Sequence, residues 1–409
     1  MPIPLFWTVV NTGPSALPGW HHLKTFGPWI AVIYLLKRYF GGTANTWERD
    51  MHGRVILMTG GTSGVGAEVA LDLASRGAQI IFLVRSTEDQ WLIEYISDLR
   101  SRSSNHLIYA EQVDLASLYS IRKFATKWLD NSPPRRLDMI ICMAGITQPP
   151  FKERVVTEDG IESQWAINYL AHYHLLTLLA PALKVQPPGR DVRVILSSCS
   201  SYVLGDLDVN DLEFVKRQYP VNKPWRVFGA SKLALIMFAK EFQTQFDNYK
   251  RPDGQENNVR VYLANPGFVR TASLRNFITL GSLWGLLVYL LTWPIWWLVL
   301  KSPNQGAQTH LYITMSPDCG KGNGAKSFNE CVEVTRSSPK KELKDEGLRK
   351  KLWEASANQI ETAEKASALR RKKVDLAKSS ASSKTFSNTT TNSQPSTTRN
   401  ANKSKSKKI

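Results

Sequence analysis

Short apolar runs alternate with longer amphipathic segments through the middle of the chain. Runs rich in β-branched residues occupy 54–59, 79–84, 106–113, 137–143, 192–198 and 259–265. Segments with apolar residues at helical spacing, such as 66–77 and 117–130, lie between these runs. Strand–helix alternation of this kind is typical of a parallel sheet covered by helices on both faces. The pattern therefore predicts an α/β fold, a single doubly wound parallel sheet within residues 51–335.

The first 50 residues contain two apolar runs, "IPLFWTVV" and "WIAVIYLL". Each is much shorter than the roughly 20 residues that a helix needs to cross a bilayer. No basic stretch precedes the first run and no small-residue cleavage site follows, so we do not expect a cleaved signal peptide. Two interpretations of residues 1–50 remain open: a shallow contact with a membrane surface, or a flap buried against the core.

A third apolar stretch, residues 278–300, carries no charged residue. By length alone it is a membrane-spanning candidate. However, Pro294 interrupts it, its tryptophans suit a headgroup region, and the segment after it has to rejoin the sheet, which a full crossing would prevent. We therefore favour embedding in one leaflet beside a substrate entrance. A lid buried in the protein and a true span are the alternatives.

Basic charge is concentrated at the C-terminal end. Of the net charge of +17, residues 370–409 contribute +10, from eleven Lys or Arg and the single acidic residue Asp375. This stretch is rich in Ser, Thr and Asn, so we expect a disordered tail, either solvated or attracted to an anionic membrane surface. Because the charge is not spread over the folded part, nucleic acid is not an expected partner.

A C-terminal helix is expected over residues 336–369. Apolar residues stand at helical spacing in it: Leu348, Leu352, Trp353 and Ile360. This helix either packs on the core or self-associates.

The cysteines and the overall composition exclude several classes of protein. Cys142, Cys199, Cys319 and Cys331 form no C-x-x-C pair and no cluster with histidine. We therefore expect free thiols, with no metal site and no disulfide scaffold. A hydrophobic content of 43% in 409 residues favours one large globular domain with extensions over a polytopic membrane protein.

The first predicted strand ends in the glycine-rich sequence "TGGTSGVGAEVA". Glycine lets the backbone turn sharply and approach a pyrophosphate, and the N-terminus of the next helix offers free N–H groups. We therefore predict a dinucleotide site that includes Thr59, Gly60, Thr62, Ser63, Gly64, Val65 and Gly66. Arg85 follows the second strand, where a guanidinium suits the 2′-phosphate of NADP and a carboxylate would suit NAD. NADP is thus favoured over NAD, with a solvated surface arginine as the alternative.

These motifs, in this order, resemble those of the short-chain dehydrogenase/reductase superfamily over residues 52–335. The likeness is strongest to its retinol-dehydrogenase-like branch, and some fungal lipid-droplet oxidoreductases look similar. The resemblance implies a Rossmann-type sheet and helix pairing that makes a homodimer possible. It assigns Ser198, Asn168 and Lys232 to catalysis and gives Asp114 an adenine contact. Further cofactor contacts are implied for Ala144, Gly145, Lys232, Pro266, Gly267, Val269 and Thr271.

Two positions depart from the family pattern. The usual strand end N-N-A-G is "CMAG" here, with Cys142 and Met143 in place of the asparagines. The catalytic tyrosine, which lies four residues before the lysine and donates the proton, is Phe228. Loss of a general acid costs on the order of 10²–10⁴ in rate, so turnover is impaired without being excluded. Tyr202 and Tyr219 are the candidate substitutes.

Two functions follow from these residues. The first is an NADP-dependent oxidoreductase that acts on a lipophilic alcohol or carbonyl, of retinoid, steroid or lipid type. The second is a pseudoenzyme that binds cofactor or lipid as a membrane-bound scaffold, which the phenylalanine favours. For either function we expect attachment to the cytosolic face of the endoplasmic reticulum or to a lipid droplet.

Overall fold

The structure, a computed structural model, describes residues 19–335 and 338–389, together with the isolated residues 7, 11, 13 and 15. Eight strands form one sheet in the order β3-β2-β1-β4-β5-β6-β7-β8, and every neighbouring pair is parallel except β7 and β8. The strands are β1 Val55–Thr59, β2 Gln79–Val84, β3 Ile108–Gln112, β4 Met139–Cys142, β5 Val192–Ser197, β6 Val259–Asn265, β7 Lys326–Asn329 and β8 Val332–Glu333. Each of the six predicted runs contains one strand. The predicted doubly wound sheet is confirmed.

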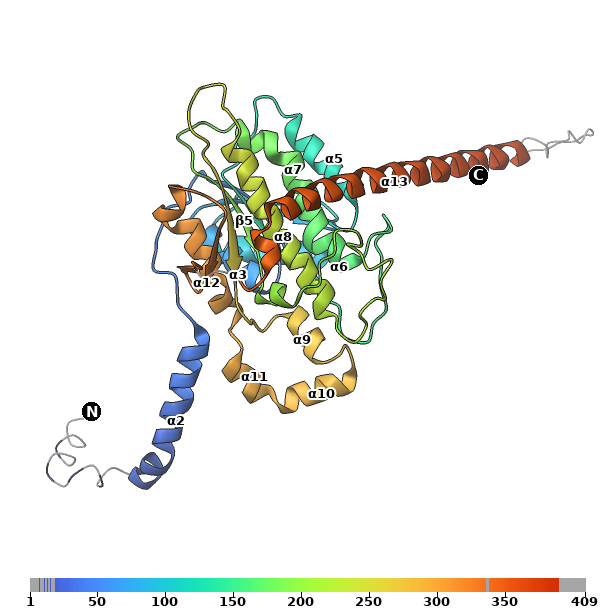
Figure 1. Cartoon of the computed structure of the whole chain (residues 1–409). Coiled ribbons are helices and arrows are strands. Elements are labelled where there is room, and N and C mark those ends of the chain that lie inside the picture. The colour runs from blue at the N-terminus through green and yellow to red at the C-terminus, as the bar shows by residue number, and fades with distance from the viewer. Residues whose placement is uncertain are drawn as a thin grey trace, which may run out of the picture.

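Helices cover both faces of the sheet (Figure 1). One face carries α3 (Gly64–Ser75), α4 (Gln90–Ser103) and α12 (Pro303–Met315). The other carries α5 (Leu118–Leu129), α7 (Ala171–Lys184) and α8 (Trp225–Asp247). Both faces of the central strands are therefore buried, which explains why those strands are continuous apolar runs. Short elements complete the domain: α6 Ser163–Trp165, η2 Ala166–Leu170, η3 Ser200–Leu204, η4 Pro317–Gly320 and η5 Lys341–Lys344.

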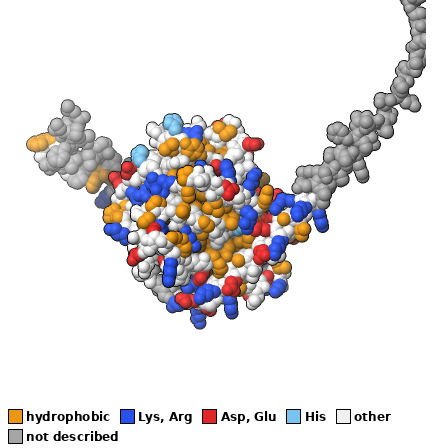
Figure 2. All heavy atoms as spheres, turned by 90° about the horizontal axis from the view of Figure 1, so that it is seen from above, with side chains coloured by type: hydrophobic (Ala, Val, Ile, Leu, Met, Phe, Trp, Pro, Cys, Tyr) orange, Lys and Arg blue, Asp and Glu red, His pale blue; other side chains and the backbone are white. Residues whose placement is uncertain are grey.

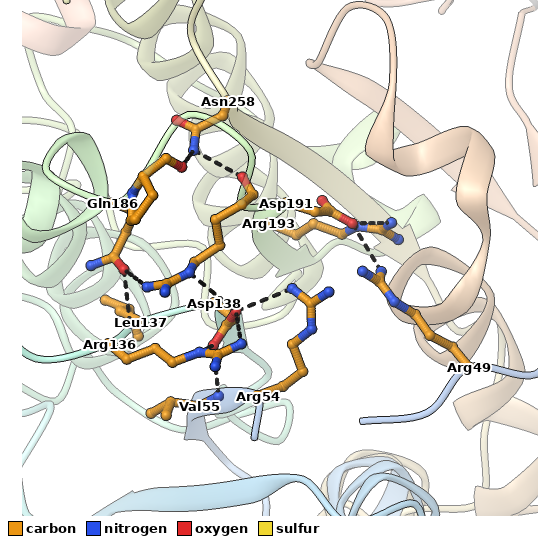
Figure 3. Close-up of polar contacts among 12 residues, drawn as sticks. Arg49, Arg54, Val55, Arg136, Leu137, Asp138, Gln186, Asp191, Arg193 and Asn258 are labelled. Atoms are coloured by element: carbon orange, nitrogen blue, oxygen red, sulfur yellow. Dashed lines mark hydrogen bonds and ion pairs between the residues drawn. The ribbon is translucent and has the colours of Figure 1, made fainter. Parts of the chain in front are cut away.

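A buried carboxylate links the amino-terminal ends of the central strands β1 and β4, at the end of the sheet opposite the glycine loop. Asp138 directly precedes β4 and is fully buried. Its oxygens accept hydrogen bonds from the Val55 amide at 2.9 Å, from Arg54 at 3.1 Å and from Arg136 at 2.7 Å (Figure 3). Because the charge is paired and hydrogen-bonded, its burial is tolerated. The cluster holds β1 against β4, the two strands on which the site is built.

The long C-terminal helix α13 (Glu346–Thr389) packs on the domain over its first turns and then runs away from it (Figure 1). Trp353 stacks on Phe238 with ring centres 5.6 Å apart, and Leu352 and Ile360 are buried. Of the two alternatives left open by the sequence, the structure shows packing on the core. Helix α13 packs on α8 and α5, and the homodimer remains a prediction.

The helix continues further than the sequence suggested. Residues 370–389, expected to belong to a disordered tail, are the end of α13. The stretch has few large apolar residues, which is typical of disorder, but its Ala, Lys and Arg residues are strong helix formers. Residues 390–409, the rest of the expected tail, lie outside the described residues.

Two apolar segments project from the domain rather than packing in it (Figure 1). The first is α2 (Trp20–Gly41), where Trp29 is 68% exposed. The second is an arm made of α9 (Ala272–Ile278), α10 (Leu283–Leu291) and α11 (Trp293–Val299), where Leu283 is 85% and Trp284 80% exposed. The alternatives of a buried flap and a buried lid are therefore wrong for these residues.

No single helix in the described part of the chain is long and apolar enough to cross a membrane. Helices α9 and α10 together have sufficient length and composition, but they meet at a bend of 104°. On the face of the domain that Figure 2 presents, Lys and Arg alternate with Asp and Glu around hydrophobic side chains and do not gather into one basic patch.

Candidate active site

The predicted site residues meet at the carboxyl ends of four neighbouring strands. Thr59 ends β1, Gly145 follows β4, Ser198 follows β5 and Pro266 follows β6. In the sheet these strands are adjacent, in the order β1-β4-β5-β6. The chain winds in opposite directions on the two sides of the β1–β4 pair, which is the position at which doubly wound sheets bind their ligands.

The glycine loop leaves no room for side chains. Gly60 and Gly64 have φ angles of +66° and +55°. A Cβ on Gly60 would lie 2.6 Å from the Ala144 nitrogen, and a Cβ on Gly66 would lie 2.1 Å from the Gly60 carbonyl oxygen. The turn therefore presents bare backbone at the N-terminus of α3, a cradle that fits a pyrophosphate. Thr62, Ser63 and Val65 lie in this turn and the first residues of α3, as predicted.

The Thr59 hydroxyl secures the strand end that lacks the family's asparagines. Its oxygen accepts hydrogen bonds from the Met143 amide at 3.2 Å and the Ala144 amide at 3.3 Å. Cys142 is buried, and burial raises the pKa of its thiol to about 12, so it stays protonated. The substitution therefore leaves the end of β4 bonded to β1 and Ala144 in place beside the cradle.

Asn168 lies in η2, a single π-helical segment between α6 and α7. Its fully buried side chain accepts a hydrogen bond from the Ile146 amide at 2.7 Å and donates to the Ile146 carbonyl at 2.9 Å. A Cβ on Gly145 would lie 3.2 Å from Asn168 Oδ1 and 3.7 Å from Lys232 Nζ. Both predicted catalytic groups thus converge on the glycine that follows β4.

Lys232 is buried on α8, and its ammonium donates to the Ser197 carbonyl at 3.0 Å. Burial lowers the pKa of this lysine. Phe228, half-buried one turn earlier, places its ring centre 5.8 Å from Lys232 Nζ. Ser198 follows β5 directly, and its amide donates to the Ala264 carbonyl at 2.8 Å. The structure therefore brings Asn168 and Lys232 to Gly145, places Ser198 next to the residue whose carbonyl Lys232 binds, and puts beside Lys232 a ring that has no proton to donate.

His172 is a site residue that the sequence reasoning missed. Thr59 Oγ1 already accepts two amide protons, so its own proton goes to His172 Nε2 at 3.1 Å. His172 Nδ1 then donates to the Asn168 carbonyl at 3.3 Å. Burial lowers the pKa of His172 to about 4, which keeps it neutral. A histidine inside an apolar helix carries no sequence signal, because core histidines look the same.

His310 of α12 is a second buried histidine near Lys232. Its Nε2 lies 2.9 Å from Ser197 Oγ, and burial lowers its pKa to about 4. The residue it contacts also provides the carbonyl that Lys232 binds. A neutral imidazole on α7 thus contacts the Asn168 carbonyl, and one on α12 contacts the hydroxyl of the residue whose carbonyl Lys232 binds.

The residues assigned to the adenosine end lie at the ends of β2 and β3. Arg85 is exposed after β2, and its guanidinium forms no ion pair within the described residues. Asp114 follows β3, where its carboxylate accepts a hydrogen bond from the Ala116 amide at 2.9 Å. This bond stabilises the turn after β3. The predicted adenine contact of Asp114 remains a prediction.

The turn after β6 closes the other side of the site. Gly267 has a φ of +76°, and Thr271 caps α9 by accepting from the Leu274 amide at 3.3 Å. The Thr271 methyl lies 3.3 Å from where a Cβ on Gly64 would be, so this turn packs against the glycine loop. Val269 is buried and pairs with Lys301.

Neither candidate substitute for the missing tyrosine joins this group. The Tyr202 hydroxyl donates to Ser338 at 3.1 Å. The Tyr219 hydroxyl lies 2.9 Å from Gln148 Oε1 and 3.1 Å from Glu162 Oε1. Neither phenol hydrogen-bonds to the catalytic trio among the described residues.

A bare glycine cradle at the switch point of a doubly wound sheet, beside a buried lysine and asparagine, defines a dinucleotide-binding domain of the dehydrogenase type. The family model described as short chain dehydrogenase matches residues 54–203. A Schizosaccharomyces pombe relative named Uncharacterized oxidoreductase pbr1 is 44% identical, over 82% of this chain and 89% of the relative. Human Retinol dehydrogenase 13 is 32% identical, over 83% of this chain and 94% of the relative.

A crystal structure of a protein from Mycobacterium Paratuberculosis has the same fold, with a TM-score of 0.55, 25% identity, and coverage of 78% of this chain and 98% of that chain. The chain therefore belongs to the short-chain dehydrogenase/reductase superfamily, in its retinol-dehydrogenase-like branch.

Proposed function

We propose that the protein is an NADP-dependent oxidoreductase that interconverts a lipophilic alcohol and its carbonyl. The observation that carries this proposal is the convergence of Asn168 and Lys232 on Gly145, next to the glycine cradle. Ser198 directly follows the neighbouring strand β5, so a substrate oxygen there would have a hydroxyl donor beside it. NADP(H), when bound, supplies or accepts the hydride.

Proton transfer to the substrate oxygen is the step that this site catalyses least well. When a carbonyl is reduced, its carbon gains a hydride and its oxygen gains a proton. Phe228 has none to give, so the proton comes from Lys232 through a water molecule beside the ring, and Lys232 is reprotonated from solvent. The lowered pKa of the buried lysine makes it a better acid than an exposed lysine. Slow turnover is the expected consequence.

The preference for NADP is supported by the position of Arg85. The guanidinium is exposed at the end of β2, without an ion pair in the described part of the chain. It is therefore free to pair with a 2′-phosphate, which a guanidinium binds with two parallel hydrogen bonds. An NAD-selective site would place a carboxylate near this point.

The substrate class is supported by the position of the apolar arm. Gly281, between α9 and α10, packs against Pro149 in the loop after β4, with 3.5 Å from its Cβ position to the proline ring. The arm thus borders the site and presents exposed hydrophobic side chains beside it. We propose that the arm contacts a membrane, on the cytosolic face of the endoplasmic reticulum or on a lipid droplet, and that the substrate enters from it.

Two measurements test the proposal. Calorimetry with NADPH and NADH asks whether the cradle binds either cofactor, and NADPH oxidation with retinal and a steroid ketone asks for turnover. A Lys232→Met variant is the control, since it keeps the length of the side chain and removes the proton donor. No binding of either cofactor would overturn the proposal. Tight NADPH binding without turnover would favour the scaffold function, for which the phenylalanine at position 228 is the supporting feature.

A further inference from the structure

One lysine joins the two projecting apolar segments, although 260 residues separate them in sequence. Lys37 of α2 donates to the Trp297 carbonyl at 2.5 Å and to the Leu300 carbonyl at 3.2 Å. Its ammonium also lies 5.0 Å from the centre of the Trp297 ring. These are carbonyls at the C-terminal end of α11, where a cation is favoured by both free lone pairs and the helix dipole.

Both segments present hydrophobic side chains to solvent. On α2 these include Trp29, Ile30 and Leu35, and on α10 they include Leu283 and Leu291. In Figure 1 the two segments leave the same lower side of the domain, and α2 packs against α11. An exposed apolar surface of this extent indicates a partner, and aromatic side chains beside a basic residue suit a lipid surface.

The arm is also bonded to the turn that follows β6. The Lys301 amide donates to the Phe268 carbonyl at 2.9 Å, and the Arg270 amide donates to the Lys301 carbonyl at 3.0 Å. Val269 and Lys301 are therefore paired as in a parallel sheet. This turn includes Gly267, which the family resemblance puts at the nicotinamide.

The chain leaving α2 reaches the same point. Lys301 is buried and pairs with Glu330 at 2.8 Å. A Cβ built on Gly42 would lie 2.5 Å from the Lys301 ammonium, and a Cβ built on Gly267 would lie 3.3 Å from it. One lysine thus packs against the end of α2 on one side and the turn after β6 on the other.

We propose that α2 and α10–α11 dock on a lipid surface as one unit joined by Lys37, and that this docking is coupled to cofactor binding through residues 300–301 and the Pro266–Thr271 turn. The inference rests on the proposed function. A lipid surface that orders the arm also orders the turn, so less ordering is left for the cofactor to impose. Coupling of this kind is reciprocal: cofactor strengthens docking by the same factor by which lipid strengthens cofactor binding.

The full chain is titrated with NADPH in the absence and presence of vesicles of phosphatidylcholine and phosphatidylinositol, and flotation of the same samples reports docking. We expect the wild-type Kd for NADPH to fall about five-fold or more when vesicles are saturating. A Lys37→Met variant keeps α2 apolar and should float, but its Kd should fall less with vesicles than that of wild type, because α2 no longer docks as one unit with the arm. The matched control is Lys24→Met, an exposed lysine on the same helix, which should behave like wild type.

A second variant separates docking from coupling. The double substitution Leu287→Lys and Leu291→Lys should abolish flotation and the vesicle effect, and should leave the Kd measured without vesicles unchanged. The coupling is overturned if wild type floats and its Kd is the same with and without vesicles. A wild type that does not float overturns the docking surface. In both cases NADPH still binds, whereas failure of the proposed function appears as no NADPH binding under either condition.

Discussion

The Lys232 ammonium lies 5.8 Å from the centre of the Phe228 ring, and both side chains lie on one face of α8, a single turn apart. The family resemblance puts a tyrosine at the position of this ring. A phenol there would have a buried cation beside it, which favours the phenolate and lowers the phenol pKa. Asn168 and this ammonium both border Gly145, and Ser198 follows the residue whose carbonyl the ammonium binds. Compared with the family pattern, the site lacks the phenol oxygen.

Phe228→Tyr should raise kcat for carbonyl reduction by roughly 10²-fold or more, because it restores a general acid next to Lys232. The measurement is NADPH oxidation with a retinal-like carbonyl under saturating cofactor. Phe228→Leu is the matched control, and it should leave the low wild-type rate unchanged. Combining Phe228→Tyr with Lys232→Met should remove most of the gain. Equal rates for wild type and Phe228→Tyr would show that proton donation does not limit this site.

Gly64→Ala should weaken NADPH binding by about ten-fold. Its φ of +55° strains any other residue, at about 1–2 kcal/mol, and the new methyl presses on Thr271 in the turn after β6. Gly254→Ala is the matched control, since Gly254 has a φ of +68° and open space around it. Both variants should lose similar stability to thermal unfolding. Only the first should lose affinity in calorimetry, and equal affinities would contradict the glycine cradle.

The strands and most of the site residues were predictable from sequence, each from a local pattern. Buried parallel strands are continuous apolar runs, so all six predicted runs contain a strand. The glycine loop was recognised because a strand precedes it and a helix follows. Ser198 and Lys232 were found from their spacing within a known order of motifs. Their closeness to Asn168 then follows from the sheet, which brings the ends of neighbouring strands together.

The features that sequence reasoning missed depend on tertiary contacts. His172 and His310 look like ordinary core residues, and only the fold brings them to Asn168 and Ser197. The sequence does not show whether α2 and the arm are exposed, because an apolar run looks the same whether protein or lipid covers it. The extension of α13 beyond residue 369 is hidden in the sequence because this stretch combines strong helix formers with a polar composition that is typical of disorder.

Arg85→Glu should reverse the cofactor preference. Removing the guanidinium takes away the pairing with the 2′-phosphate, and the new carboxylate repels that phosphate while accepting a hydrogen bond from a ribose hydroxyl. The ratio of the Kd for NADPH to that for NADH should rise by about 10²-fold, measured by calorimetry. Arg102→Glu, an exposed arginine on α4, serves as the charge-matched control and should leave the ratio unchanged. An unaltered ratio in Arg85→Glu would mean that this arginine is only a solvated surface residue.

Acidification should destabilise the fold through His172 and His310, which are buried and neutral in the folded state. The pKa values of His172 and His310 are lowered to about 4 by burial, from an ordinary value near 6.5. Between these values the unfolded chain binds protons that the folded protein does not, so the free energy of unfolding falls as the pH falls. From pH 7.5 to 5.5 each histidine should cost about 1.4 kcal/mol of stability. Urea unfolding at the two pH values measures this difference. A His310→Gln variant should lose about half of it, whereas His106→Gln, at an exposed position shortly before β3, should retain it in full. A wild type equally stable at both pH values would contradict the assignment of these histidines as neutral in the folded state.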